Sequence, residues 1–148
     1  MHLYKTTKGA VLRRANAFQF LDSDWDPLIS NDDLYRFLSG QADDCCDQAK
    51  DAVENHLMAP IGPQEIWACG VTYYNSQMAR REESEAAGGG DFYSRVYRAE
   101  RPEIFFKSTA NRATGHGQNV RIRSDSTWDV PEPELTLVVS PTGKILGY

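Results

Sequence analysis

The chain has 148 residues, 41% of them hydrophobic and 11% aromatic, which is enough for one ordinary globular domain with a real core. Its formal net charge of −5 argues against nucleic-acid binding, because phosphates need a basic surface. No run approaches the roughly 20 apolar residues that span a bilayer, and the N-terminus lacks the apolar stretch of a signal peptide. The cysteines (Cys45, Cys46 and Cys69) have no disulfide or metal-knuckle spacing and indicate free thiols in a reducing cytoplasm.

The chain opens with a pattern typical of a small sheet. Leu3 to Gly9 and Ala10 to Leu21 predict two short strands around a tight turn. Further along, Pro60 and Pro63 interrupt the regular spacing, and after them short apolar segments separated by turns replace the helical pattern. We therefore predict a small N-terminal α/β domain over residues 1–60 and a second domain over 61–148.

Two helices are expected before that boundary. Asn31 can cap the first, with Asp32 and Asp33 in its first turn, and Gly40 can end it. The second is predicted from Asp43 to Leu57 by its apolar spacing.

Short strands and two more helices are expected in the second domain. Ser76 to Glu85 predicts one helix, and Asp91 can cap another that extends to Ala99. Three consecutive glycines within Ala86 to Gly90 indicate a loop, which fits either a lid or a plain linker. The expected strands are Glu65 to Thr72, Ile104 to Lys107, Val120 to Arg123, Leu135 to Ser140 and Ile145 to Tyr148, the last two joined by a hairpin turn.

Glu132 and Glu134 are two carboxylates that stand two residues apart, just before an apolar run. In an extended chain, residues i and i+2 point to the same face, so these side chains would project side by side. Like charges that close repel unless a proton or cation lies between them, and ligands that offer only oxygen suit magnesium, calcium or manganese better than zinc. Taken alone, the pair fits a solvated surface more often than a metal site.

Five segments follow one another in a specific order: Glu65 to Tyr73, Arg101 to Lys107, Gly115 to Gly117, Arg123 to Ser126 and Pro131 to Leu135. Together they resemble the fumarylacetoacetate hydrolase family, and within it the branch that dehydrates 2-keto-3-deoxy sugar acids such as 2-keto-3-deoxy-D-arabinonate. The resemblance is strong from about Pro60 onward and loose before it. It implies an α+β fold in which the small N-terminal α/β domain precedes the first half of a mixed β-sandwich roll.

The resemblance also implies a Mg²⁺-dependent lyase, with Ca²⁺ or Mn²⁺ as alternatives, whose metal is held by Glu132 and Glu134. The carboxylate and keto oxygens of a 2-oxo acid would chelate the metal, which stabilises the enolate formed when a C3 proton leaves. Glu103 would be the general acid/base that handles this proton. Its structural alternative is a salt bridge with Arg98 or Arg101.

Lys107, Arg112 and Ser76 are the candidate substrate-binding residues. The two cations can meet the carboxylate or hydroxyl groups of an anionic substrate. In the hydrolase branch, a motif that begins at the equivalent of Gly70 ends in a histidine that helps activate water, and Ser76 stands in that place here. Serine cannot act as that base at neutral pH without its own activator, which favours dehydration over hydrolysis. His116 is as consistent with shaping its loop as with taking part in the site.

Members of the family continue beyond the equivalent of Tyr148 into a segment that supplies a third metal ligand, an aspartate, and the strands that close the roll. We therefore expect an N-terminal fragment that is inactive alone, rather than a naturally shortened relative. The expected partners are a small-molecule 2-keto-3-deoxy sugar acid and further copies of the chain in a cytoplasmic homo-oligomer, without nucleic acid or membrane. The alternatives are a hydrolase or isomerase of acylpyruvate-type 2-oxo acids, or a non-catalytic fragment or binding module.

Overall fold

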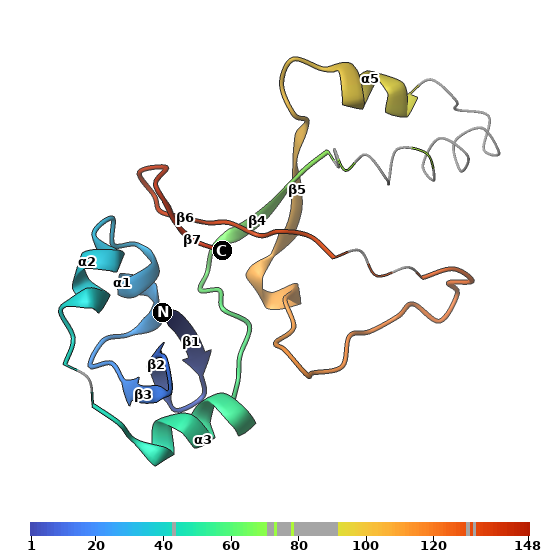
Figure 1. The fold of residues 1–148 in the computed structure, drawn as a ribbon. Helices are drawn as coiled ribbons and strands as arrows, with labels where there is room; N and C mark the ends of the chain where they lie inside the picture. The colour runs from blue at the N-terminus through green and yellow to red at the C-terminus, as the bar shows by residue number, and fades with distance from the viewer. Residues whose placement is uncertain (43, 71–72, 74–77, 79–91, 130, 132) are drawn as a thin grey trace. The chain divides into compact units, whose positions relative to one another are not determined.

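The computed structural model describes residues 1–42, 44–70, 73, 78, 92–129, 131 and 133–148. Their contacts form two compact units, Met1–Pro63 with Arg112–Tyr148, and Gln64–Asn111. Short helices accompany antiparallel sheets (Figure 1), which confirms the predicted mixed class at that level. The division of the chain into domains at residue 60 stays a prediction. Among the described residues, no helix is long and apolar enough to cross a membrane.

The N-terminal sheet has three antiparallel strands in the order β1 (His2–Thr6), β2 (Gly9–Arg14) and β3 (Ala17–Phe20). The prediction of a single second strand over Ala10 to Leu21 is wrong, because a two-residue turn splits this segment into β2 and β3. In that turn Ala15 has a φ of 48°, while Arg14 pairs with Ala17 to close the hairpin. Asn16, a common turn residue, was the signal for this break.

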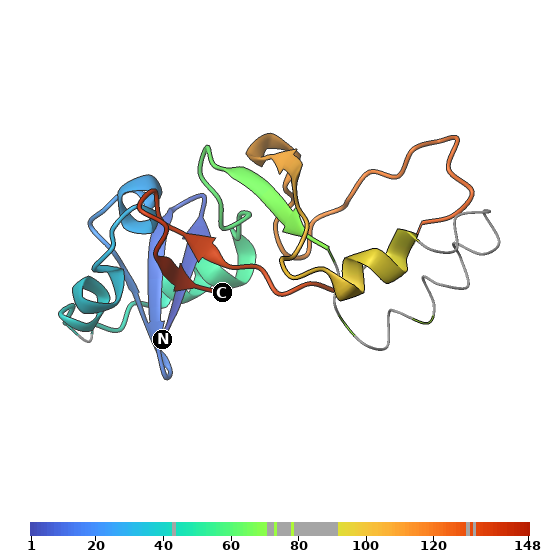
Figure 2. The ribbon, with the colours of Figure 1, turned by 90° about the horizontal axis from the view of Figure 1, so that it is seen from above.

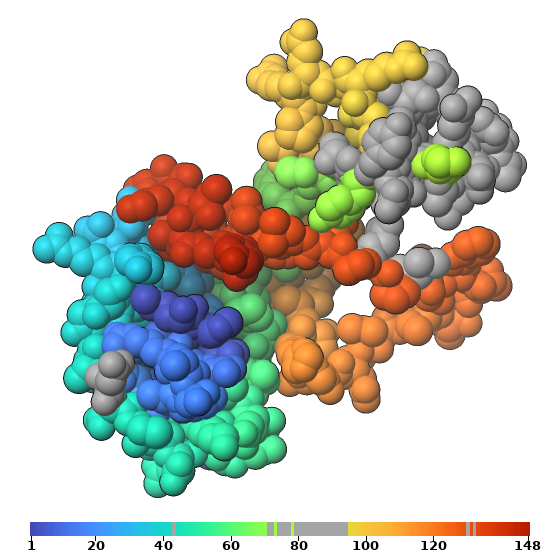
Figure 3. All heavy atoms as spheres, viewed as in Figure 1, coloured from blue at the N-terminus to red at the C-terminus, as the bar shows by residue number. Residues whose placement is uncertain are grey.

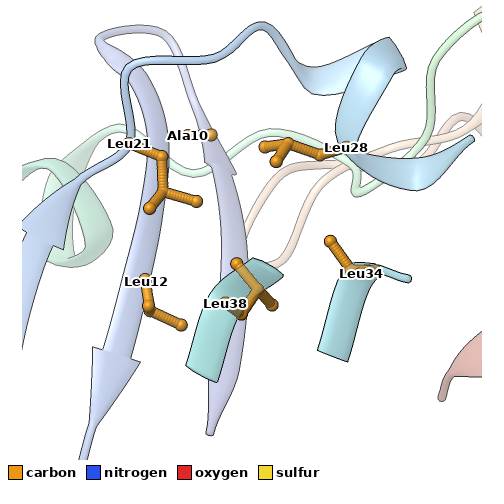
Figure 4. Packing of buried hydrophobic residues seen from close by; sticks show 6 residues of the cluster. All are labelled: Ala10, Leu12, Leu21, Leu28, Leu34 and Leu38. Atoms are coloured by element: carbon orange, nitrogen blue, oxygen red, sulfur yellow. The ribbon is translucent and has the colours of Figure 1, made fainter. Parts of the chain in front are cut away.

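Alternation along β2 sends apolar side chains to both faces of this sheet. On one face, α1 (Trp25–Ile29) and α2 (Leu34–Ser39) cover a cluster of buried residues (Figure 4): Ala10, Leu12, Leu21, Leu28, Leu34 and Leu38. On the other face, α3 (Asp47–Asn55) packs Ala49 and Ala52 against Val11. Burying each large aliphatic side chain stabilises the fold by about 1.5–3 kcal/mol, so this sheet and its helices have a core of their own.

The helix boundaries differ from those predicted. Helix α1 was not predicted, α3 is shorter than Asp43 to Leu57, and α2 begins after Asp33 instead of Asn31. Asn31 instead accepts a hydrogen bond from the backbone N–H of Asp33 at 2.9 Å, as in an Asx turn. Gly40 ends α2, as expected.

The unit Gln64–Asn111 is built around the antiparallel pair β4 (Glu65–Cys69) and β5 (Ile104–Thr109), with α5 (Phe92–Arg98) between them in the sequence. These three elements confirm predicted ones, whereas the predicted helix 76–85 and loop 86–90 lie outside the described residues. A short 3₁₀ helix, η1 (Ala110–Arg112), follows β5. No apolar side chain among the described residues of this unit is fully buried.

The C-terminal residues form the predicted hairpin, with β6 (Val138–Val139) paired to β7 (Ile145–Gly147). The register advances by two residues on β7 against one on β6, so Leu146 is an extra residue that packs against the leucine cluster under α1 and α2. The prediction of a strand over Val120 to Arg123 is wrong, and only the end of Leu135 to Ser140 is a strand. These segments have apolar side chains but lack a neighbouring strand among the described residues.

Candidate functional site

Glu103 lies just before β5, where the chain passes close to the end of β4. Its carbonyl oxygen accepts a hydrogen bond from the backbone N–H of Gly70 at 2.8 Å. A β-carbon on Gly70 would lie 3.8 Å from Oε2 of Glu103 and only 2.8 Å from Cγ1 of Val96 in α5. The glycine therefore permits the close approach of strand, helix and carboxylate.

The Glu103 carboxylate is exposed, and no ion pair joins it to Arg98 or Arg101 within the part of the chain that the structure describes. An exposed carboxylate is free to meet a substrate proton if the reacting carbon is brought within hydrogen-bond reach. Its role as general acid/base stays a prediction.

Lys107 occupies a β-bulge. Ile66 pairs with Ser108 and Trp67 with Phe106, so Lys107 is an extra residue on β5 with no partner in β4. A bulge re-aims side chains and is common beside active sites. The Lys107 ammonium lies 5.9 Å from the centroid of the Phe105 ring, and the side chain is exposed and able to meet an anion.

The loop after η1 is fixed at Gly115. A β-carbon there would lie 3.0 Å from backbone atoms of both Met58 and Ala59, so a larger residue would require this backbone to shift. The Gly115 N–H donates to Oε1 of Gln118 at 3.0 Å. The next residue, His116, is exposed in a turn, as is Arg112 at the end of η1.

Polar side chains order the loop that precedes the carboxylate pair. Arg123 makes two hydrogen bonds to the Asp125 carboxylate, and this contact lowers the pKa of Asp125 and raises that of Arg123. The Ser126 hydroxyl donates to Oδ1 of Asp129 at 2.9 Å. These bonds fit a role for Asp125 and Ser126 in shaping the loop that leads to the carboxylate pair.

Glu134 is exposed in the irregular segment before β6, and Glu132 lies outside the described residues. Among the described residues, no group of three or more histidine, cysteine, aspartate or glutamate side chains is placed to hold a metal ion. The donor chemistry itself fits a hard cation, because magnesium is usually held by one or two carboxylates together with water and substrate oxygens. Glu132 and Glu134 thus remain candidate ligands.

The structure groups the predicted site residues in two sets. Glu103 and Lys107 belong to the unit Gln64–Asn111, whereas Arg112 and Glu134 belong to the other unit. Ser76 lies outside the described residues, so its predicted contact with substrate has no structural counterpart here.

Sequence reasoning missed two sets of contacts. Residue spacing gave no sign that Gly70 lies close to Val96 and Glu103, and the one cue was a glycine inside the predicted strand 65–72, since glycine in a strand often marks a close approach. It also missed that Thr142, in the hairpin turn, binds Asp32. Such contacts join residues far apart in the chain, which periodicity cannot reveal.

No family model matches the chain. Two curated proteins are similar to it. The 2-dehydro-3-deoxy-D-arabinonate dehydratase of Saccharolobus solfataricus is 50% identical over 93 residues, covering 62% of this chain and 31% of that protein. The probable 2-keto-3-deoxyxylonate dehydratase of Haloferax volcanii is 46% identical over 112 residues, covering 75% of this chain and 37% of that protein.

A solved structure of 2-keto-3-deoxyarabinonate dehydratase has the same fold over 99% of this chain, with a TM-score of 0.69 and 32% sequence identity. The match covers 53% of the solved chain, so this chain spans about half of its length, and the matches to the curated relatives span about a third of theirs. The expectation that relatives are much longer is confirmed. Over the part of their length that it spans, the chain is a homologue of the 2-keto-3-deoxy sugar acid dehydratases, as its motifs predict.

Proposed function

We propose that the protein is a Mg²⁺-dependent dehydratase, a lyase that removes water from a 2-keto-3-deoxy sugar acid. The observation that carries this proposal is the 46–50% identity with two proteins named for such reactions. We further propose that it belongs to the fumarylacetoacetate hydrolase family, since the motif order that marks the resemblance lies in this chain.

Glu132 and Glu134 are the residues that would hold the metal, and Ca²⁺ or Mn²⁺ would suit the same oxygen donors. When bound, Mg²⁺ supplies Lewis-acid polarisation of the 2-oxo group. The Arg123–Asp125 and Ser126–Asp129 contacts restrain the loop that leads into these carboxylates. Two adjacent anions gain from a cation because it offsets their mutual repulsion.

The exposed Glu103 carboxylate takes the C3 proton of the substrate in this proposal. The 2-oxo group makes that proton acidic, and Glu103 then returns it to the departing C4 hydroxyl, so that one water molecule leaves. Lys107, presented by its bulge, and Arg112 neutralise the carboxylate or bind the hydroxyls of the sugar acid. Ser76 would contribute a hydroxyl contact.

A serine at position 76 also supports dehydration over hydrolysis. The hydrolase branch needs a histidine in that place to activate water, and a serine hydroxyl is too weak a base at neutral pH. A dehydratase has no attacking water and does not need that base.

The mixed β-sandwich roll and the homo-oligomer are part of the same proposal. Strands β4 and β5 carry large apolar side chains that are far from buried, with Trp67 57% and Ile104 62% exposed. Such a two-stranded sheet gains stability when further strands or another copy cover it. We also retain the cytoplasm as the proposed location, in keeping with the free thiols of all three cysteines.

An assay of the intact protein tests the activity. With Mg²⁺ present, it should turn over at least one of a panel of 2-keto-3-deoxy aldonates, and a chelator should abolish the rate. Acylpyruvates serve as the matched control substrates. Turnover of acylpyruvates alone would replace the dehydratase with the hydrolase or isomerase alternative.

A further inference from the structure

The tip of the C-terminal hairpin is bound to the loop between α1 and α2. The Thr142 hydroxyl lies 2.8 and 2.7 Å from the two carboxylate oxygens of Asp32, and the Lys144 ammonium donates to the Asp32 carbonyl oxygen at 2.5 Å. Ser140 lies 3.0 Å from the Thr142 hydroxyl and completes the polar cluster. In Figure 3, the red atoms of the hairpin lie against the cyan atoms of this loop region.

An apolar contact adds to these bonds. Leu146, the extra residue on β7, packs against the leucine cluster beneath α1 and α2. Figure 2 shows the hairpin beside the N-terminal sheet from a second direction. The hairpin is therefore fixed to the N-terminal sheet and helices by both polar and apolar contacts.

The stretch that carries Glu134 is anchored at both ends. At its start, Gly115 approaches the backbone of Met58 and Ala59, and at its end the hairpin binds Asp32. Glu134 comes only four residues before Val138 in β6, and four extended residues reach at most about 14 Å. The place of the hairpin therefore limits where the Glu134 carboxylate can be.

We propose that Asp32 and Thr142 are positioning residues for the metal site, so that the N-terminal region sets the location of the Glu134 carboxylate through the hairpin. This inference rests on the proposed function, because Glu134 must be a ligand for its position to matter. Asp32 and Thr142 touch neither metal nor substrate in this scheme. They hold the segment that carries Glu134 in place before the cation binds. Binding then costs less conformational entropy.

The test is calorimetric titration of the intact protein with Mg²⁺. Thr142→Val removes the hydroxyl while keeping the shape, and it should raise the Mg²⁺ dissociation constant about three- to tenfold, as expected when one hydrogen bond of the anchor is lost. Thr142→Ser should restore the original affinity. Lys144→Met, which removes the second donor to Asp32, should weaken binding in the same direction and serves if Thr142→Val fails to fold.

Two further variants make the outcome decisive. Asp33→Asn is the control: it removes a negative charge one residue after Asp32 and should leave Mg²⁺ affinity unchanged. Glu134→Gln removes a proposed ligand and should weaken binding severely. If Glu134→Gln does so while Thr142→Val and Lys144→Met do not, the positioning role is overturned and the proposed function stands. Unchanged affinity in Glu134→Gln would overturn both.

Discussion

The described parts of Met1–Pro63 and Gln64–Asn111 differ in where their apolar side chains lie. In the first region, residues such as Val11 and Leu12 are 0% and 1% exposed, between helices on both faces of a sheet. In the second, Phe105 and Phe106 on β5 are 41% and 48% exposed. The first region has a buried core, whereas the described part of the second presents apolar side chains that are partly exposed.

The candidate catalytic and substrate-binding residues of these two regions lie in the one whose described residues form no buried core. Glu103 and Lys107 belong to the region with the exposed apolar strands, while the buried core of the N-terminal region contains no charged residue among those described. Active sites commonly lie where loops and strand ends are open to ligands, on a scaffold that is stabilised elsewhere. Stability and chemistry should therefore respond to different substitutions.

Replacing the proposed base should produce the largest effect. Glu103→Gln in the intact protein should lower turnover by about 10²- to 10⁴-fold, the usual contribution of general acid/base catalysis, and should leave folding and Mg²⁺ affinity unchanged. Steady-state kinetics and circular dichroism check this. Glu100→Gln, an exposed neighbour, is the control. Near-normal turnover, or an unfolded variant, would return Glu103 to a structural role.

A core substitution should affect stability instead. Leu12→Ala should lower the free energy of unfolding by about 2–5 kcal/mol, because it leaves a cavity beneath α1 and α2. Trp67→Ala should lower the free energy of unfolding of the same 148-residue chain by under about 1 kcal/mol, since the Trp67 side chain is largely exposed. Urea unfolding measures both. Equal losses of stability in the two variants would contradict the conclusion that, of the described parts of the two regions, only the first has a well-packed core.

Gly70 bears on both stability and the candidate site, because it lets β4, α5 and Glu103 approach one another closely. Gly70→Ala should lower the free energy of unfolding by about 1–3 kcal/mol, as overpacking against Val96 requires. Adding Val96→Ala should recover most of the loss. Gly147→Ala is the matched control, because a β-carbon there has nothing within 4 Å. A neutral Gly70→Ala would mean that α5 does not pack on the strand end.

Acid should loosen the hairpin anchor, which is the smallest effect. Hydrogen bonds from Ser140 and Thr142, followed by the charge of Lys144, lower the pKa of Asp32. A lowered folded-state pKa stabilises the fold fully above the unfolded value, near pH 4, and this contribution is lost as the pH falls through the folded pKa. The free energy of unfolding, measured as a function of pH, should show this loss. Asp32→Asn should make that free energy depend less on pH in the acid range.

The sequence predicted elements well where the signal was local. The Pro141 to Lys144 turn, α5 and β5 all form from patterns contained within a few residues. Predictions failed where tertiary contacts decided the outcome. Val120 to Arg123 alternates as a strand should, yet it lacks a pairing partner within the described residues, and an isolated strand is not stable.

The candidate site shows the same limit. Residue types and their order were enough to nominate Glu103, Lys107 and Glu134. They could not reveal that Lys107 occupies a bulge, since that depends on its register against β4. Nor could they show that Asp32 binds Thr142, a residue 110 positions away, in place of serving the start of a helix.

The dehydratase proposal is tested most directly by identifying the product that the intact protein makes from a 2-keto-3-deoxy sugar acid with Mg²⁺. Nuclear magnetic resonance in D₂O would follow the C3 proton, and mass spectrometry would weigh the product. We expect loss of one water molecule with a C3 proton removed to solvent. Cleavage of a carbon–carbon bond, or no reaction across the panel of sugar acids, would contradict it.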